Sequence, residues 1–138
     1  MADWYWIGVC VGIAAAAAVV GTAAVPSAKL RIFVGTALGT LVGVFVGLQF
    51  HWYEAVGGIV GAATGLVGAY PLVAGAGRRG GTYLGTAVLV VVAAVVIAGL
   101  AFVPVLGYVE AVALLVLGLR LRRRRGDRYA GLRTLARD

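Results

Sequence analysis

The sequence predicts an all-α integral membrane protein, built as a bundle of five membrane-spanning helices. Three observations lead to this class: the composition, a series of long apolar runs, and the placement of the basic residues. Of the 138 residues, 62% are hydrophobic and only 12% are charged, and the mean hydropathy is +1.02. A soluble domain is typically about 25% charged. This chain therefore lacks the polar side chains that would cover the surface of a soluble protein.

Five apolar runs account for most of the chain. A spanning helix needs about 20 mostly apolar residues, with about 17 to 25 tolerated. Pro26 follows the first run, and Pro104 suits the first turn of the last span because its missing N–H costs little there. The expected spans are residues 4–25, 32–49, 55–76, 82–101 and 105–119. The last boundary leaves an alternative with four spans, in which residues 105–119 are re-entrant or lie in the interface.

The basic residues give the orientation. Lys29 and Arg31 lie between the first two spans, Arg78 and Arg79 lie between the third and fourth, and the other eight follow the fifth. With five spans, all twelve fall on one side, which the positive-inside rule makes cytoplasmic. The N-terminus is then outside and the C-terminus inside. A four-span chain would place its basic loops and its tail on opposite faces.

Glycines recur every four residues through the second and third spans. A stripe of small residues lets two helix backbones approach closely in lipid. We expect a glycine zipper that makes spans one to three a tight core, with span two sealed against span three and spans four and five facing lipid. The alternative is that the stripes join several copies of the chain. The glycines are Gly35, Gly39, Gly43 and Gly47 in span two, and Gly57, Gly61 and Gly65 in span three.

Two hairpins share an order of sequence signals. Each begins after a basic pair and continues with aromatic-x-Gly-Thr-Ala, at residues 33–37 and again at residues 83–87. The return helices open with Tyr and Glu-Ala-Val, at residues 53–56 and 108–112. Parallel repeats of this kind occur in transporters. An internal duplication is therefore a hypothesis for this chain.

Two carboxylates are the candidates for chemistry. Glu110 falls near the middle of the last apolar run, where an ionisable group suggests a proton or cation site that faces the bundle interior, with Thr82, Thr86 or Tyr108 as its partner. If that span begins at Pro104, Glu110 instead lies close to the outer surface. Glu54 lies at the outer end of the third span beside His51. It is either part of a thin cation site or an interfacial anchor and helix cap.

The end of the chain is strongly basic. Residues 122–138 are expected to form a cytoplasmic tail that follows the bundle of residues 1–121, with Asp127 capping a short amphipathic helix in the interface. Each basic residue near anionic lipid contributes about 1 kcal/mol. A docking site for a cytosolic protein is the alternative, and nucleic acid is not an expected partner. The residues expected at lipid headgroups are Arg122, Arg123, Arg124, Arg125 and Arg128.

The sequence contains no catalytic motif that indicates an activity. The single cysteine, Cys10, lies in an apolar run and cannot form an internal disulfide. We therefore expect no enzyme activity, metal or cofactor. The first hypothesis is a structural, accessory or assembly component that packs against itself or a larger complex. The alternative is a small oligomeric channel or transporter that uses Glu110. Eleven arginines against one lysine are typical of a GC-rich genome and favour a bacterial inner membrane.

Overall fold

The computed structural model describes residues 3–78 and 82–135, and this part of the chain contains five α-helices and no strand. By length and composition, three helices could cross a membrane: α1, α2 and the part of α3 from Trp52 to Ala76. The apolar part of α4, Leu84–Leu100, is shorter. The all-helical class is therefore confirmed. The helices are α1 (Asp3–Ala23), α2 (Ala28–Leu48), α3 (Trp52–Arg78), α4 (Tyr83–Leu100) and α5 (Leu106–Leu135).

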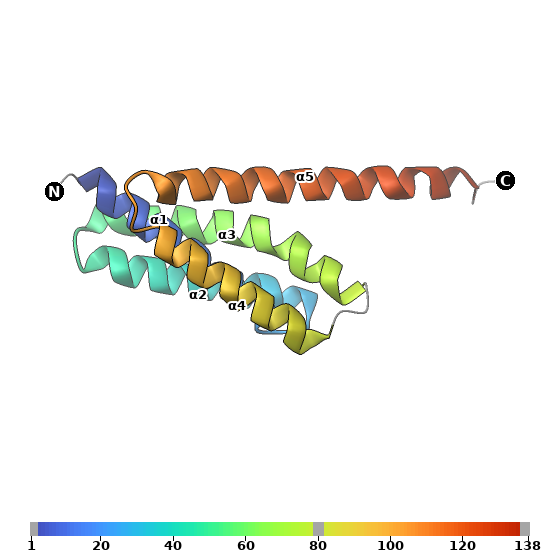
Figure 1. The fold of residues 1–138 in the computed structure, drawn as a ribbon, viewed down its shortest axis with the longest axis horizontal. Coiled ribbons are helices and arrows are strands. Elements are labelled where there is room, and N and C mark those ends of the chain that lie inside the picture. Colours follow the sequence, from blue (N-terminus) through green and yellow to red (C-terminus); the bar gives the residue numbers. More distant parts are fainter. Residues whose placement is uncertain (1–2, 79–81, 136–138) are drawn as a thin grey trace.

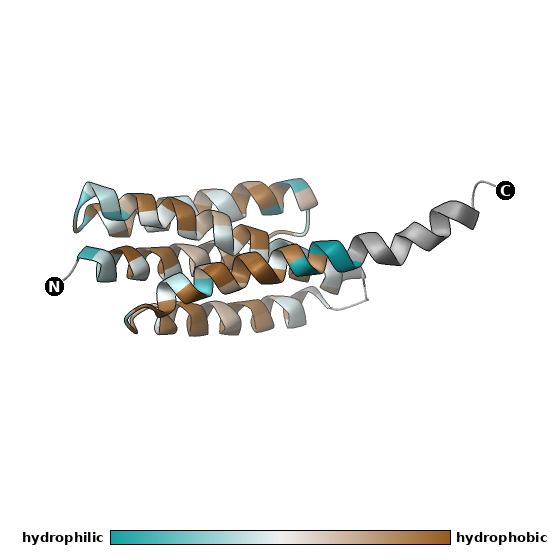
Figure 2. Ribbon diagram, turned by 90° about the horizontal axis from the view of Figure 1, so that it is seen from above, coloured by the Kyte–Doolittle hydropathy of each residue, from teal (hydrophilic) through white to brown (hydrophobic). Residues whose placement is uncertain are grey.

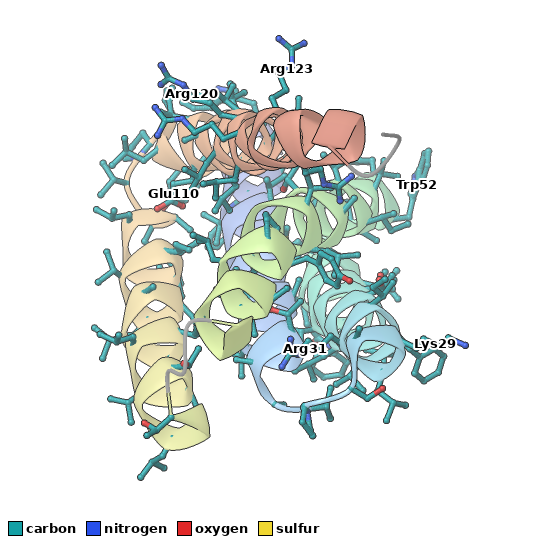
Figure 3. The ribbon with its side chains drawn as sticks, turned by 90° about the vertical axis from the view of Figure 1, so that its right-hand side faces the viewer. Lys29, Arg31, Trp52, Glu110, Arg120 and Arg123 are labelled. Atoms are coloured by element: carbon teal, nitrogen blue, oxygen red, sulfur yellow. The ribbon has the colours of Figure 1, made fainter. Side chains whose placement is uncertain are left out.

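The helices alternate in direction, so that the bundle has two distinct ends (Figure 1). One end, here called the amino end, holds the start of α1, the α2–α3 turn and the α4–α5 turn. The opposite end, here called the basic end, holds the α1–α2 turn, and the side chains of Lys29, Arg31, Arg120 and Arg123 extend there (Figure 3). Hydrophobic residues occupy the helices between the two ends (Figure 2).

Helix α1 forms the centre of the bundle. It contacts each of the other four helices, and Val9, Cys10, Ala14 and Ala18 are at most 1% exposed. The alanines and glycines of α1 explain this position, because a helix with short side chains on all faces can accept neighbours on every side. The sequence did predict α1 as part of the tight core. It did not predict that α1 would be the helix around which the others pack.

Helix α4 is the most loosely held of the five. It packs along α1 but has only slight contact with α3 and α5. Its large apolar side chains are exposed along the helix, with Leu84 and Leu89 at 73% and Val95 at 65%. The expectation that the fourth helix is peripheral agrees with this arrangement.

Two local expectations for the last helix are wrong. Pro104 lies in the α4–α5 turn rather than in the first turn of α5, because Val105 follows it with a left-handed backbone (φ 72°) and the helix begins only at Leu106. The tail also has no separate helix that starts at Asp127. α5 continues without interruption to Leu135, and the arginines and leucines that favour a helix there outnumber Gly126, Asp127 and Gly131, with no proline to break it.

Candidate functional site

The glycines of α2 lie where other backbones and small side chains come closest. A Cβ atom added to Gly43 would lie 2.6 Å from the Cα atom of Gly58 in α3, and one added to Gly47 would lie 2.6 Å from the Cα atom of Ala55. These distances are too short for any side chain. Gly35 and Gly39 face both α1 and α3, through Thr22, Ala18, Ala62 and Leu66.

The second glycine stripe serves a different neighbour. Gly57, Gly61 and Gly65 face α1, where the nearest residues are Ile7, Val11 and Ala15 in turn. The residues of α3 that meet the glycines of α2 lie on a neighbouring face of the helix: Ala55, Gly58, Ala62 and Leu66. The structure thus assigns the stripe of α3 to α1 rather than to the α2–α3 seam. With its two faces of small residues, α3 packs closely against both helices.

Glu54 is buried at the amino end of the bundle. It lies in the first turn of α3 and is 1% exposed, the largest of the fully buried side chains in the described part of the chain. Its Oε1 atom is 3.9 Å from Nδ1 of His51, and its Oε2 atom has no hydrogen-bond partner among the described residues. The two hypotheses for Glu54, a cation site or an interfacial anchor and helix cap, stay predictions. The start of α3 packs directly against the end of α2 at the α2–α3 turn, and this contact buries Glu54. A Cβ atom on Gly47 would lie 2.7 Å from the carbonyl carbon of Glu54.

Glu110 occupies a similar position on the other side of the bundle. It is the fifth residue of α5, so it lies about one turn from the start of the helix and not at the middle of a span. Figure 3 shows it on the side of α5 that faces α4. A Cβ atom on Gly12 of α1 would lie 3.3 Å from its Oε2 atom. Both carboxyl oxygens are buried, and neither has a hydrogen-bond partner within the described residues.

The partners predicted for Glu110 are wrong. Thr82 and Thr86 are at the start of α4, about 27 Å and about 21 Å along its axis from the α4–α5 turn. Thr82 instead caps α4 by accepting a hydrogen bond from the backbone N–H of Gly85. The hydroxyl of Tyr108 donates to the carbonyl oxygen of Trp4.

Two tyrosine hydroxyls link the start of α1 to the α4–α5 hairpin by hydrogen bonds. The sequence did not predict these links. Besides the bond from Tyr108 to Trp4, the hydroxyl of Tyr5 donates to the carbonyl oxygen of Phe102 at 2.9 Å. The related signal in the sequence is the presence of aromatic residues in the segments that meet at the amino end of the bundle. Such clusters indicate an interface, but they do not reveal which backbone group each hydroxyl binds.

Comparison with protein-family models, with curated proteins and with solved structures gives no match to this chain. Its chemistry therefore has to be argued from the site itself.

Each of the two buried carboxyl groups is a candidate site. Each return helix, α3 or α5, carries one glutamate near its start, and both groups are buried at the amino end. Both oxygens of Glu110 lack a hydrogen-bond partner among the described residues, whereas Oε1 of Glu54 faces Nδ1 of His51. Burying a charged carboxylate without a partner is costly, which makes Glu110 the stronger candidate for handling a proton or a cation. No cluster of three metal-ligating side chains occurs in the described residues.

The predicted headgroup-binding arginines lie beyond the apolar part of α5. The side chains of Arg122, Arg123 and Arg124 are exposed. Arg125 and Arg128 belong to the predicted set, but their side chains lie outside those that the structure describes.

Proposed function

We propose that this chain is a five-span protein of the bacterial plasma membrane, with its N-terminus outside and its C-terminus in the cytoplasm, and that it acts as a structural or assembly component. The observation that carries this proposal is the contrast between a closely packed core and an open helix. Helices α1 to α3 pack through glycine backbones, whereas α4 leaves most of its apolar surface uncovered.

The five-span arrangement is supported by helix direction and length. The apolar part of α4 has 17 residues and a length of about 26 Å, close to the roughly 30 Å of a bilayer core. A small mismatch of this kind is accommodated by local thinning. In α5, the apolar part is shorter, but Arg120 can extend its charged end toward the headgroups. The α1–α2 turn, which carries the basic residues Lys29 and Arg31 near the start of α2, lies at one end of the bundle, and α5 runs toward that same end (Figure 1).

The topology is tested by labelling single cysteines from each side of the membrane in a Cys10→Ala background. His51→Cys and Val103→Cys should react with an impermeant maleimide in intact cells treated to open the outer envelope. Lys29→Cys and Arg123→Cys should react only after the membrane is permeabilised. If positions 103 and 123 react from the same side, the four-span alternative is correct and this proposal is wrong.

The assembly role rests on α4, because this helix is held by the bundle along one face only. A residue near the middle of its exposed surface is Val92, which is 56% exposed, and a matched position on α2 is Phe45, which is 67% exposed. A photoreactive amino acid at each position reports what lies against that helix in the membrane. We expect position 92 to give one defined protein adduct, either a second copy or one other membrane protein, and position 45 to give lipid adducts. Identical adducts at both positions would contradict the proposal.

A second function is favoured by the buried oxygens of Glu110. In this alternative, the chain forms a small oligomeric channel or transporter for a proton or a cation, and Glu110 carries the transported ion. Proton and potassium flux into proteoliposomes is the test, with Asp3→Asn, at the exposed start of α1, as the control. Loss of flux in Glu110→Gln but not in the control supports the alternative, and unchanged flux in Glu110→Gln rejects it.

A further inference from the structure

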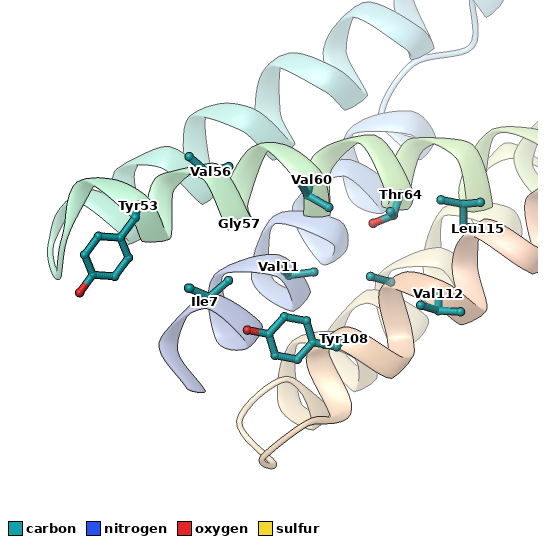
Figure 4. Close-up of a pocket in the computed structure, with 11 residues that line it drawn as sticks. Ile7, Val11, Tyr53, Val56, Gly57, Val60, Thr64, Tyr108, Val112 and Leu115 are labelled. Carbon is teal, nitrogen blue, oxygen red and sulfur yellow. The ribbon is translucent and has the colours of Figure 1, made fainter. Parts of the chain in front are cut away.

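A long apolar groove opens between α3 and α5 at the amino end of the bundle. Its volume is about 470 Å³, and side chains from three helices converge on it (Figure 4). Helix α1 provides the floor with Ile7 and Val11. One wall comes from α3, at Val56, Val60 and Thr64, and the other comes from α5, at Val112 and Leu115.

The groove has the depth of one membrane leaflet. Along α3, it extends from Tyr53 to Thr64, which is about 16 Å at a rise of 1.5 Å per residue. The hydrocarbon core of a bilayer is about 30 Å thick, so half of it is about 15 Å. The groove therefore begins at the level of the amino-end turns and ends close to the midplane, if the bundle spans the membrane as proposed above.

The groove is narrow and suits a slender occupant better than a helix. A volume of about 470 Å³ over a length of about 16 Å gives a mean cross-section of about 29 Å². A helix with its side chains is about 10–12 Å across. A single extended hydrocarbon chain fits this cross-section. If the groove stayed empty in a bilayer, the side chains that line it would lose van der Waals contacts on that side.

The mouth and the interior of the groove differ in character. Tyr53 and Tyr108 lie at the amino end of the groove (Figure 4), and aromatic side chains of this type favour the headgroup level. Deeper in the groove, the lining is aliphatic apart from Thr64. The hydroxyl of Thr64 donates to the carbonyl oxygen of Gly61 at 3.0 Å, so its proton is already engaged within α3. A molecule with an apolar chain and a polar head matches this lining, because the chain can lie against the aliphatic interior and the head against the tyrosines at the mouth.

We propose that this groove binds one acyl chain of a phospholipid from the leaflet at the amino end. The inference rests on the membrane placement proposed above, but it does not depend on the assembly role of α4 or on proton transport. The bound chain fills the space between α3 and α5, two helices that otherwise approach each other only along part of their length. The headgroup lies near the tyrosines at the mouth.

The test uses vesicles of phosphatidylglycerol that contain a small fraction of the same lipid with a diazirine in the middle of one acyl chain. After irradiation, the labelled residues are located by peptide mass spectrometry. Three variants are compared with the parent. Val60→Trp fills the groove from a position on α3 that is 49% exposed, and Val112→Trp fills it from the opposite wall, so that the result does not depend on the folding of one variant. The control, Leu48→Trp, adds bulk to α2 outside the groove at a position that is 59% exposed.

We expect adducts at residues 56–64 and 111–115 to exceed those at residues 45–48 of α2 by on the order of tenfold, which corresponds to about 1.4 kcal/mol in binding free energy. Both groove-filling variants should lose this excess, and Leu48→Trp should retain it. Even labelling of all lipid-facing helices would overturn the proposal, as would a groove signal that survives both fillings. A wrong membrane placement is recognised by a different experiment, because the cysteines at positions 29, 51, 103 and 123 would then not react from the sides of the membrane given above.

Discussion

The two hairpins of this bundle, α2–α3 and α4–α5, share an order of sequence signals but pack in different ways. In the first hairpin, Gly43 lies against Gly58 and Gly47 lies against Ala55, with no room for a side chain. In the second, α4 and α5 have only slight contact, and a Cβ atom on Gly99 would have nothing within 4 Å. Turn signals in the sequence therefore set where a hairpin lies, whereas small residues at matched positions let its two helices pack in close contact.

The hairpins also share a feature that the glycines do not explain. Each brings a tyrosine and a glutamate to the amino end, Tyr53 with Glu54 and Tyr108 with Glu110. The tyrosines line the same groove and both carboxyl groups are buried. Internal duplication remains a hypothesis, and the shared placement of these two pairs is what favours it.

The largest effect is expected from a side chain placed in the closed hairpin. In Gly58→Leu the new Cβ would meet the backbone of Gly43, which cannot move like a flexible side chain. We expect a loss of about 3 kcal/mol in the free energy of unfolding, at the upper end of the usual range for overpacking. The matched control, Gly99→Leu in the open hairpin, should stay within about 1 kcal/mol of the parent, with helix propensity in its favour. Unfolding of both variants by titration with a denaturing detergent measures the difference.

Equal stability of Gly58→Leu and the parent would show that α2 and α3 separate easily, and the contrast between the hairpins would then disappear. A large loss in Gly99→Leu would show that the open face of α4 is covered in solution, by a second copy or by another part of the chain.

The helices themselves were predictable because their boundaries have local causes. Pro26 and the polar stretch around His51 interrupt the apolar runs, and no tertiary contact is needed to place them. The central position of α1 was not predictable in the same way. Its residues are small and apolar on every face, so periodicity does not indicate which side a neighbour covers. Only the combined packing of four other helices decides that α1 is the buried one.

The candidate site was predicted in identity but not in depth. Glu110 and Glu54 stood out as the acidic residues in or beside apolar runs. The depth of Glu110 depends on where α5 begins, and this is fixed by the left-handed backbone at Val105, which no sequence pattern indicated. The burial of Glu54 depends on how closely the turn packs at Gly47, a contact between residues of two helices.

A second comparison uses the two buried carboxyl groups. Glu54→Met and Glu110→Met replace each one with an apolar side chain of similar length. Because an unsatisfied buried polar group costs about 1–3 kcal/mol, we expect Glu54→Met to stabilise the protein by about 2 kcal/mol. Glu110→Met should have the same sign and a smaller effect, since Glu110 as a whole is only partly buried. Thermal unfolding in a mild detergent measures both. Destabilisation by Glu54→Met would mean that the contacts of its carboxyl group, with His51 among them, outweigh the cost of burying it, and Glu54 would then be a structural residue.

The smallest effect concerns how the open hairpin is held to α1. Tyr108 and Tyr5 each donate one hydrogen bond between the start of α1 and the α4–α5 hairpin. Tyr108→Phe and Tyr5→Phe should each cost about 0.6–1 kcal/mol, the usual range for one such bond in protein or in lipid. The loss should appear as faster amide exchange in residues 101–106, because local opening exposes the turn before the bundle unfolds. Exchange in the α2–α3 turn, at residues 49–52, serves as the internal control and should not change. If both turns exchanged faster together, the two hairpins would open as one unit, and the glycine contacts of the first would not make it independent of the second.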